Sequence, residues 1–331
     1  MRGIRGSLVA LLLLSVGLLP GTAQANLVFV LNSGEASISL LDAARREQIR
    51  RIPVLREPHH LVLTPDGRSL VVGDSAGNEL LFFDPATGEL QRRERISNPY
   101  HLDFSPDGRW LVIASLRRGQ IDIYEAPGED GGLRLVRRHR FPHMPSHMAF
   151  SPDSRTVYLT LQGAGRVVAI SLETMEVLWQ AEVGPEPAGI LWHRGQLIVG
   201  IMGRDHFAVL DPELRQVVRT IPIGRGAHAI FAAPGGQVLW ATSRVDSRVA
   251  AIDPESLRVL QVFEIPGGPD CLAFDAEGRV WMTLRWVGRV GRLDPETGQV
   301  ETIRVGRSPH GIFVHWPRGA EGPAAPPSAQ R

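Results

Sequence analysis

The chain of 331 residues contains no lysine, because all 36 of its basic residues are arginine. Without lysine there is no residue to form a Schiff base with a carbonyl substrate and no lysine general base. There is also no P-loop lysine to hold nucleotide phosphates. These three kinds of active site are therefore excluded.

Cysteine is almost absent as well, since Cys271 is the only one. The chain cannot form an internal disulfide, so its stability must come from its core. No Cys-x-x-Cys-His motif is present, which excludes covalently attached c-type haem. The single thiol is then either buried and inert or used as a ligand.

Long hydrophobic runs are missing except at the N-terminus. Arg2 and Arg5 precede an apolar run from Leu8 to Leu19, and Ala23-Gln24-Ala25 forms a small-x-small cleavage site. This pattern is typical of a secretory signal peptide over residues 1–25, and the run is too short for a membrane span. The sequence therefore predicts a periplasmic or secreted protein with no membrane span after cleavage.

Net charge is also small. The formal charge is +1, and it becomes about −1 once Arg2 and Arg5 are removed with the signal peptide. A protein that binds nucleic acid through its phosphates needs a surplus of basic residues. We therefore expect no nucleic-acid partner.

What the sequence does contain is a repeat of about forty residues. One phrase, Pro-x-His followed by apolar residues and Pro-Asp-Gly, begins at Pro58, Pro99 and Pro145. Looser copies begin at Pro187, Gly226, Pro269 and Pro309. A fixed period of this length indicates a repeat architecture.

Each repeat contains four short apolar or β-branched runs that are separated by Gly, Pro and Asp turns, which is typical of the four-stranded blade of a β-propeller. The start of the mature chain, from LVFVL onward, matches the second, third and fourth strands, while PHGIFVHW from Pro309 is a first strand with nothing after it. Pairing these ends closes a ring and removes an exposed sheet edge. The sequence predicts an all-β, seven-bladed propeller over residues 26–317, a disordered tail over residues 318–331, and a monomer.

The repeat phrase, the Ser-Pro-Asp-Gly turn and the third strand ending in Asp-Pro resemble the YVTN-type repeat proteins, including the periplasmic YncE-like group. The resemblance covers roughly residues 26–317. It implies the propeller fold and says little about function, because propellers include enzymes, binding proteins and scaffolds.

The third position of the phrase should lie at one mouth of the central channel, where the chain reaches the innermost strand of each blade. The seven residues at this position are His60, His101, His147, Gly189, His228, Cys271 and Gly311. Imidazole and thiolate are ligands for zinc, copper or haem iron. His60, His101, His147, His228 and Cys271 are therefore candidate metal ligands, and His59 and His310, one position earlier, could join them. The alternative is that each ring simply bonds to the backbone of a neighbouring blade.

The loops between the second and third strands should lie on the same face as this mouth. They carry arginines, of which Arg117, Arg166, Arg204, Arg244 and Arg285 are candidates for the channel rim together with the histidines. Guanidinium groups around a concave mouth suit a carboxylate or phosphate. The alternative is that these arginines only solvate the turns.

Two further resemblances widen the range of functions. Histidine and arginine on one rim resemble the haem-d-binding propellers of the nitrite-reductase type, which implies a non-covalent tetrapyrrole. The segments GPDCLAF and SPHGI resemble streptogramin-lyase propellers, although His310 has no evident glutamate partner on the adjacent second strands.

We therefore expect a module that binds a small anionic ligand or a periplasmic protein through a His/Arg-lined mouth. The alternatives are a protein that handles a transition metal or tetrapyrrole, and a lyase or lactonase that uses a rim histidine.

Overall fold

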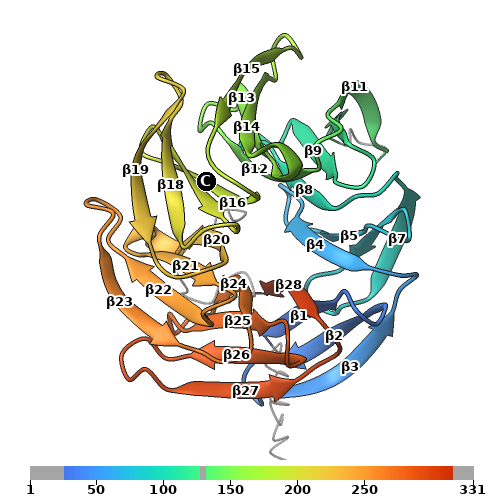
Figure 1. The fold of residues 1–331 in the computed structure, drawn as a ribbon. Coiled ribbons are helices and arrows are strands. Elements are labelled where there is room, and N and C mark those ends of the chain that lie inside the picture. The colour runs from blue at the N-terminus through green and yellow to red at the C-terminus, as the bar shows by residue number, and fades with distance from the viewer. Residues whose placement is uncertain (1–25, 127–131, 316–331) are drawn as a thin grey trace, which may run out of the picture.

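The computed structural model describes residues 26–126 and 132–315, so the predicted signal peptide and tail lie outside the described residues. These residues form seven four-stranded antiparallel sheets arranged as blades around a central axis (Figure 1). The prediction of a seven-bladed, all-β propeller is confirmed. No helix in these two segments is long and apolar enough to cross a membrane.

The strands occupy four radial positions in the ring (Figure 1). The innermost strands are β4 (Pro58–Leu63), β8 (His101–Phe104), β12 (Pro145–Phe150), β16 (Pro187–His193), β20 (Ala227–Ala232), β24 (Pro269–Phe274) and β28 (Pro309–Val314). The second strands are β1 (Leu27–Asn32), β5 (Leu70–Asp74), β9 (Trp110–Ser115), β13 (Thr156–Leu161), β17 (Gln196–Ile201), β21 (Leu239–Ser243) and β25 (Val280–Leu284).

The third strands are β2 (Ser37–Asp42), β6 (Glu79–Phe83), β10 (Gln120–Glu125), β14 (Arg166–Ser171), β18 (His206–Asp211), β22 (Arg248–Ile252) and β26 (Arg289–Leu293). The outermost strands are β3 (Glu47–Pro53), β7 (Leu90–Arg95), β11 (Arg134–Arg140), β15 (Val177–Glu182), β19 (Gln216–Pro222), β23 (Val259–Glu264) and β27 (Val300–Arg304). Two 3-10 turns, η1 (Gln162–Ala164) and η2 (Pro234–Gly236), complete the described elements.

The ring closes through the two ends of the propeller. Strand β28 pairs antiparallel with β1, with Phe313 opposite Phe29 and Ile312 opposite Val30, so one blade has the order β28-β1-β2-β3 (Figure 1). The predicted pairing of the orphan C-terminal strand with the first blade is confirmed.

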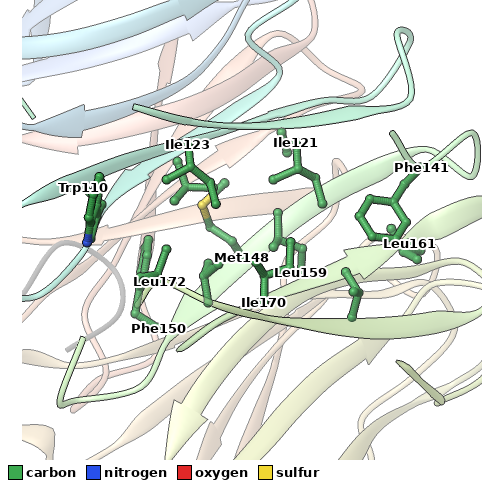
Figure 2. Close-up of a cluster of buried hydrophobic side chains, with 14 residues drawn as sticks. Trp110, Ile121, Ile123, Phe141, Met148, Phe150, Leu159, Leu161, Ile170 and Leu172 are labelled. Atoms are coloured by element: carbon green, nitrogen blue, oxygen red, sulfur yellow. The ribbon is translucent and has the colours of Figure 1, made fainter. Parts of the chain in front are cut away.

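The burial of the strands explains their composition. Strands near the axis are buried on both faces, so β1 (LVFVLN) reads as a continuous apolar run, whereas the outer strand β3 (EQIRRIP) is largely exposed. Apolar side chains from adjacent blades interlock. In one such cluster, Trp110 and Ile121 of one blade pack with Met148 and Phe150 of the next (Figure 2).

Candidate functional site

The start of six of the seven inner strands is irregular, β8 being the exception, and this irregularity builds the site. In β24 the register passes from Pro269 opposite Leu284 to Leu272 opposite Met282, so the inner strand has one residue more than its partner. Register shifts lie at the corresponding place in β4, β12, β16, β20 and β28. A β-bulge re-aims side chains. The second and third positions of the repeat phrase can therefore both contribute to one cluster.

Six histidines gather at the axis in what we call the axial cluster, which also includes Tyr100, Asp270, Cys271, Arg244 and Arg285. Ring centroids lie 4.0 Å apart for His59 and His310, 4.6 Å for His60 and His310, and 4.3 Å for His60 and His101. His147 lies 5.0 Å from His60 and 5.5 Å from His228. The five candidate histidines at the rim, including His310, are thus brought together.

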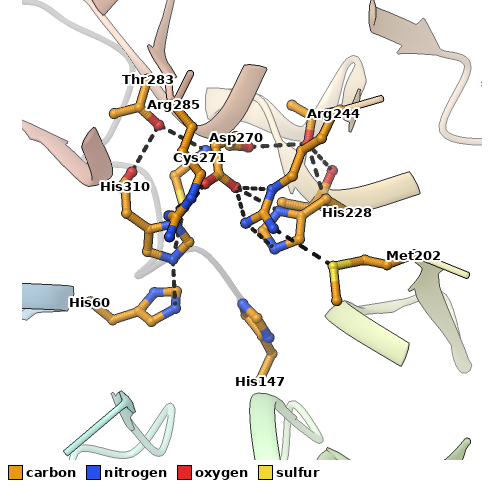
Figure 3. A network of polar contacts seen from close by, with 12 residues as sticks. His60, His147, Met202, His228, Arg244, Asp270, Cys271, Thr283, Arg285 and His310 are labelled. Carbon is orange, nitrogen blue, oxygen red and sulfur yellow. Dashed lines mark hydrogen bonds and ion pairs between the residues drawn. The ribbon is translucent and has the colours of Figure 1, made fainter. Parts of the chain in front are cut away.

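Asp270 is the hub of the polar contacts in this cluster (Figure 3). Its Oδ1 accepts a hydrogen bond from Nε of Arg244 at 2.9 Å, and its Oδ2 accepts one from Nη1 of Arg285 at 3.2 Å. Nδ1 of His310 lies 2.7 Å from Oδ2, and Nδ1 of His228 lies 2.8 Å from Oδ1. The carboxylate is fully buried, so four charged or polar groups replace its hydration.

The pKa values follow from this burial. Burial works against ionisation of Asp270, but Arg244 and the neighbouring histidines hold its pKa well below the usual range. Burial lowers the pKa of His101 and of His228 to about 3, and that of His310 to about 4. At neutral pH the cluster therefore contains one carboxylate, two guanidinium groups and uncharged imidazoles.

Threonines of the second strands connect the blades beneath the cluster. Oγ1 of Thr283 accepts a hydrogen bond from the backbone N–H of Cys271 and donates one to the carbonyl of His310 in the next blade. Thr242 makes the same bridge from Ala229 to the carbonyl of Asp270. These bridges fix the spacing between neighbouring bulges.

Some polar atoms of the cluster have no partner among the described residues. Nδ1 of His59, Nδ1 of His101 and Nε2 of His147 are buried without a hydrogen bond. These three nitrogens therefore do not make the hydrogen bonds to neighbouring backbone that the purely structural alternative requires. Buried donors and acceptors are normally satisfied, so these nitrogens are open to a water, a ligand or an ion.

Two groups of residues in the described part of the chain bring potential metal ligands close together. They are His59, His60 and His310, and Asp270, Cys271 and His310, with the ligand atoms of each group within 4.8 Å of one another. His101, His147 and His228 belong to neither group, although the sequence pattern grouped them with His60 and Cys271. Cys271 is buried, and its Sγ lies 3.9 Å from Nε2 of His310.

The candidate arginines separate into two sets. Arg244 and Arg285 reach the axial cluster, with side chains that are 20% and 25% exposed. Arg117 instead pairs with Glu57, Arg166 pairs with Glu182, and Arg204 contacts the carbonyl of Gly203 at the surface. These three side chains are exposed and make no hydrogen bond or ion pair with the described residues of the cluster.

Tyr100 and Asp270 belong to the cluster although the sequence pattern singled out neither, and Asp270 is its hub. It occupies the second position of the repeat phrase, which is also the position of His59 and His310. Comparing the second positions as a set would have found it, because an acid and two histidines recur there.

A family model described as "YNCE-like beta-propeller" matches residues 7–318. Curated proteins give no match. Among solved structures, the dihydro-haem d1 dehydrogenase NirN in complex with DHE is similar, with a TM-score of 0.67 and 16% identity over 88% of this chain and 76% of that one.

Two further solved structures are similar. The periplasmic gluconolactonase PpgL of Pseudomonas aeruginosa has a TM-score of 0.70 and 20% identity over 88% of this chain and 99% of that one. Virginiamycin B lyase of Staphylococcus aureus has a TM-score of 0.64 and 15% identity over 77% and 88%. At these identities the likeness establishes the fold alone.

Proposed function

Since the chain belongs to the YncE-like β-propeller family, a fold whose function depends on its site, we propose that it is an exported binding protein for a small anion. The ligand binds at the mouth of the channel, above the axial cluster, and contacts Arg244 and Arg285. The ligand class is a carboxylate or an inorganic oxyanion. The signal-peptide pattern of residues 1–25 supports export.

The charge of the cluster is the observation that carries this proposal. Two guanidinium groups face one ionised carboxylate, and the imidazoles are neutral, so one positive charge is left uncompensated. A net charge in a largely buried site is costly unless a counter-charge is bound. An anion at the mouth supplies that counter-charge.

The hydrogen-bonding groups left over point to the same ligand. Arg285 uses Nη1 for Asp270 and the ring of His310, and its Nε and Nη2 make no hydrogen bond among the described residues. Nη1 of Arg244 contacts only Sδ of Met202, at 3.7 Å. Because both side chains remain partly exposed, these N–H groups are available to the planar oxygens of a carboxylate or to a phosphate.

Two facts favour binding over turnover. Asp270 and His310 form an acid–base pair, but His310 is fully buried and its Nε2 faces Nε2 of His60 at 3.1 Å. A general base must lie within hydrogen-bond reach of the proton that it removes. A ligand held by the partly exposed Arg244 and Arg285 does not come that close to Nε2 of His310. The contacting imidazoles also leave no space among themselves for a tetrapyrrole.

The test is the response of chelator-treated protein to phosphate and to citrate, measured by calorimetry and by the thermal unfolding midpoint at constant ionic strength. We expect one anion per chain to bind and to raise the midpoint, because a ligand that binds only the folded state stabilises it. Arg285→Gln should weaken binding by about 10-fold or more, the range of a lost charge-assisted hydrogen bond.

The matched control is Arg248→Gln, because Arg248 pairs with Glu264 on the surface, away from the mouth. It should bind the anion as the wild type does. If neither phosphate nor citrate binds more tightly than chloride, or if both variants lose binding equally, the proposal is wrong.

A further inference from the structure

We propose that His59, His60 and His310 form a binding site for a late first-row transition metal ion, such as Zn²⁺ or Cu²⁺. This site lies below the mouth and is separate from the arginine N–H groups that the anion uses. The inference goes beyond anion binding and does not depend on it.

His310 is oriented as a metal ligand. Its Nδ1 lies 2.7 Å from Oδ2 of Asp270 and 2.9 Å from Nη1 of Arg285. The shorter contact is with the carboxylate, which only accepts hydrogen bonds, so we assign the proton to Nδ1. The lone pair of His310 is therefore on Nε2. A carboxylate behind a histidine is the usual arrangement that fixes the tautomer and ring orientation of a metal-bound imidazole.

The second ligand faces the first. Nε2 of His60 lies 3.1 Å from Nε2 of His310 (Figure 3). Two imidazole nitrogens bound to one tetrahedral Zn²⁺ at about 2.0–2.1 Å are roughly 3.3 Å apart. The observed separation thus places both nitrogens where a shared ion needs them, with little movement required.

The third ligand is His59, and its evidence is separate from the contact between His60 and His310. One nitrogen of His59 lies within 4.8 Å of ligand atoms of both His60 and His310. Its side chain is buried, and Nδ1 has no hydrogen-bond partner among the described residues. A bound ion would satisfy a nitrogen that otherwise carries the cost of an unmade hydrogen bond.

The donor set selects the metal. Three imidazoles suit Zn²⁺, Cu²⁺ and Ni²⁺, whereas Mg²⁺ and Ca²⁺ prefer oxygen ligands, and the nearby carboxylate of Asp270 is already paired with two arginines. Asp270 supplies the nearest negative charge, behind the His310 ring, and Sγ of Cys271 lies 3.9 Å from Nε2 of His310.

The experiment titrates chelator-treated full-length protein with Zn²⁺ in competition with a chromophoric chelator, and with Co²⁺ followed by its visible absorption. We expect one equivalent of each to bind, with an affinity for Zn²⁺ at least about 100-fold above that for Mg²⁺. Zn²⁺ should also raise the thermal unfolding midpoint. Failure of wild-type protein to bind Zn²⁺ or Co²⁺ more tightly than Mg²⁺ overturns the inference, whatever the variants do.

Variants then assign the ligands. His60→Gln and His310→Gln should each abolish stoichiometric binding, and Asp270→Asn should weaken it by about 10–100-fold, as expected for a residue that orients a ligand. His206→Gln is the control, because His206 lies at the surface beside Asp205. Wild-type affinity in folded His60→Gln and His310→Gln, verified by circular dichroism, would contradict the assignment. Because phosphate and citrate are tested on metal-free protein, either proposal can fail alone.

Discussion

At the scale of single residues, Asp270 organises the axial cluster. It is the carboxylate that Arg244, Arg285, His228 and His310 share, and it has no exposed surface. Breaking a buried ion pair by removing one partner leaves an uncompensated charge, which costs more than the pair itself contributes. The position should therefore tolerate little change.

Asp270→Asn keeps the shape of the side chain but removes its charge. We expect it to lower the free energy of unfolding by about 3–5 kcal/mol, because two partly buried guanidinium groups lose their counter-charge. Urea unfolding of both proteins at neutral pH measures the difference. The control is Glu182→Gln, whose exposed pair with Arg166 is worth less than about 1 kcal/mol. Similar effects of the two substitutions would mean that Asp270 does not organise the cluster.

At the scale of elements, the blades are held in register near the axis by threonine bridges. Thr283 on β25 links the bulge of β24 to that of β28, so its hydroxyl both accepts from the backbone and donates to it. These two bonds set the separation of Asp270, Cys271 and His310.

Thr283→Val is nearly isosteric and leaves the N–H of Cys271 and the carbonyl of His310 without a partner. Each unsatisfied buried group costs about 1–3 kcal/mol, so we expect a loss of roughly 2–5 kcal/mol in the free energy of unfolding. Thr302→Val is the matched control, because Thr302 is exposed on the outer strand β27. Equal stability of the two variants by thermal unfolding would show that the bridge does not hold the blades.

At the scale of the whole molecule, ring closure depends on β28. This strand buries Ile312 and Val314 against the first blade and supplies His310 to the cluster. Removing it exposes the edge of β1 and opens the ring.

A chain that ends at Gly306 should therefore be strongly destabilised, since each large apolar side chain removed from the core accounts for about 1.5–3 kcal/mol and the closure is also lost. Its unfolding midpoint should fall further than that of any single substitution above. A chain that ends at Pro317 is the control, because it loses only the predicted tail. If the shorter chain melts at the wild-type temperature, β28 does not close the ring.

The buried histidines give the whole molecule a pH dependence. The pKa values of His101 and His228 are about 3 in the folded protein, against about 6.5 in an unfolded chain. Between these values the unfolded state binds more protons, so the free energy of unfolding rises with pH and falls as the solution is acidified. At pH 5 each of these histidines should lower the free energy of unfolding by about 2 kcal/mol relative to its value at pH 7 or above.

Urea unfolding of chelator-treated protein at pH 5 and pH 7 measures this loss. At pH 5, His101→Asn should reduce the proton uptake on unfolding by about one, because one buried neutral imidazole is removed. Equal stability at both pH values would contradict the assignment of these histidines as buried and neutral.

The sequence by itself determined the repeat, the number of blades and the closure. Each blade must bury the same strands against its neighbours, so the same turn and apolar pattern recur in the chain. The missing first strand before Leu27 and the extra one from Pro309 predicted the pairing that β28 and β1 make. The gathering of His60, His101, His147 and Cys271 at the axis followed from their equivalent positions in the repeat. The prediction that His228 shares this third position was wrong, because the register of β20 places it at the second position, which Asp270 and His310 occupy in their blades.

Only the tertiary structure decided which atoms of the site meet. The bulges at the start of the inner strands turn a second position such as Asp270 or His310 toward the axis, and a bulge has no periodic signature in the sequence. The arginines were equivalent by position, yet Arg285 reaches Asp270 while Arg166 turns to Glu182. A long, flexible side chain goes to the nearest carboxylate, and the packing of the blades sets which carboxylate that is.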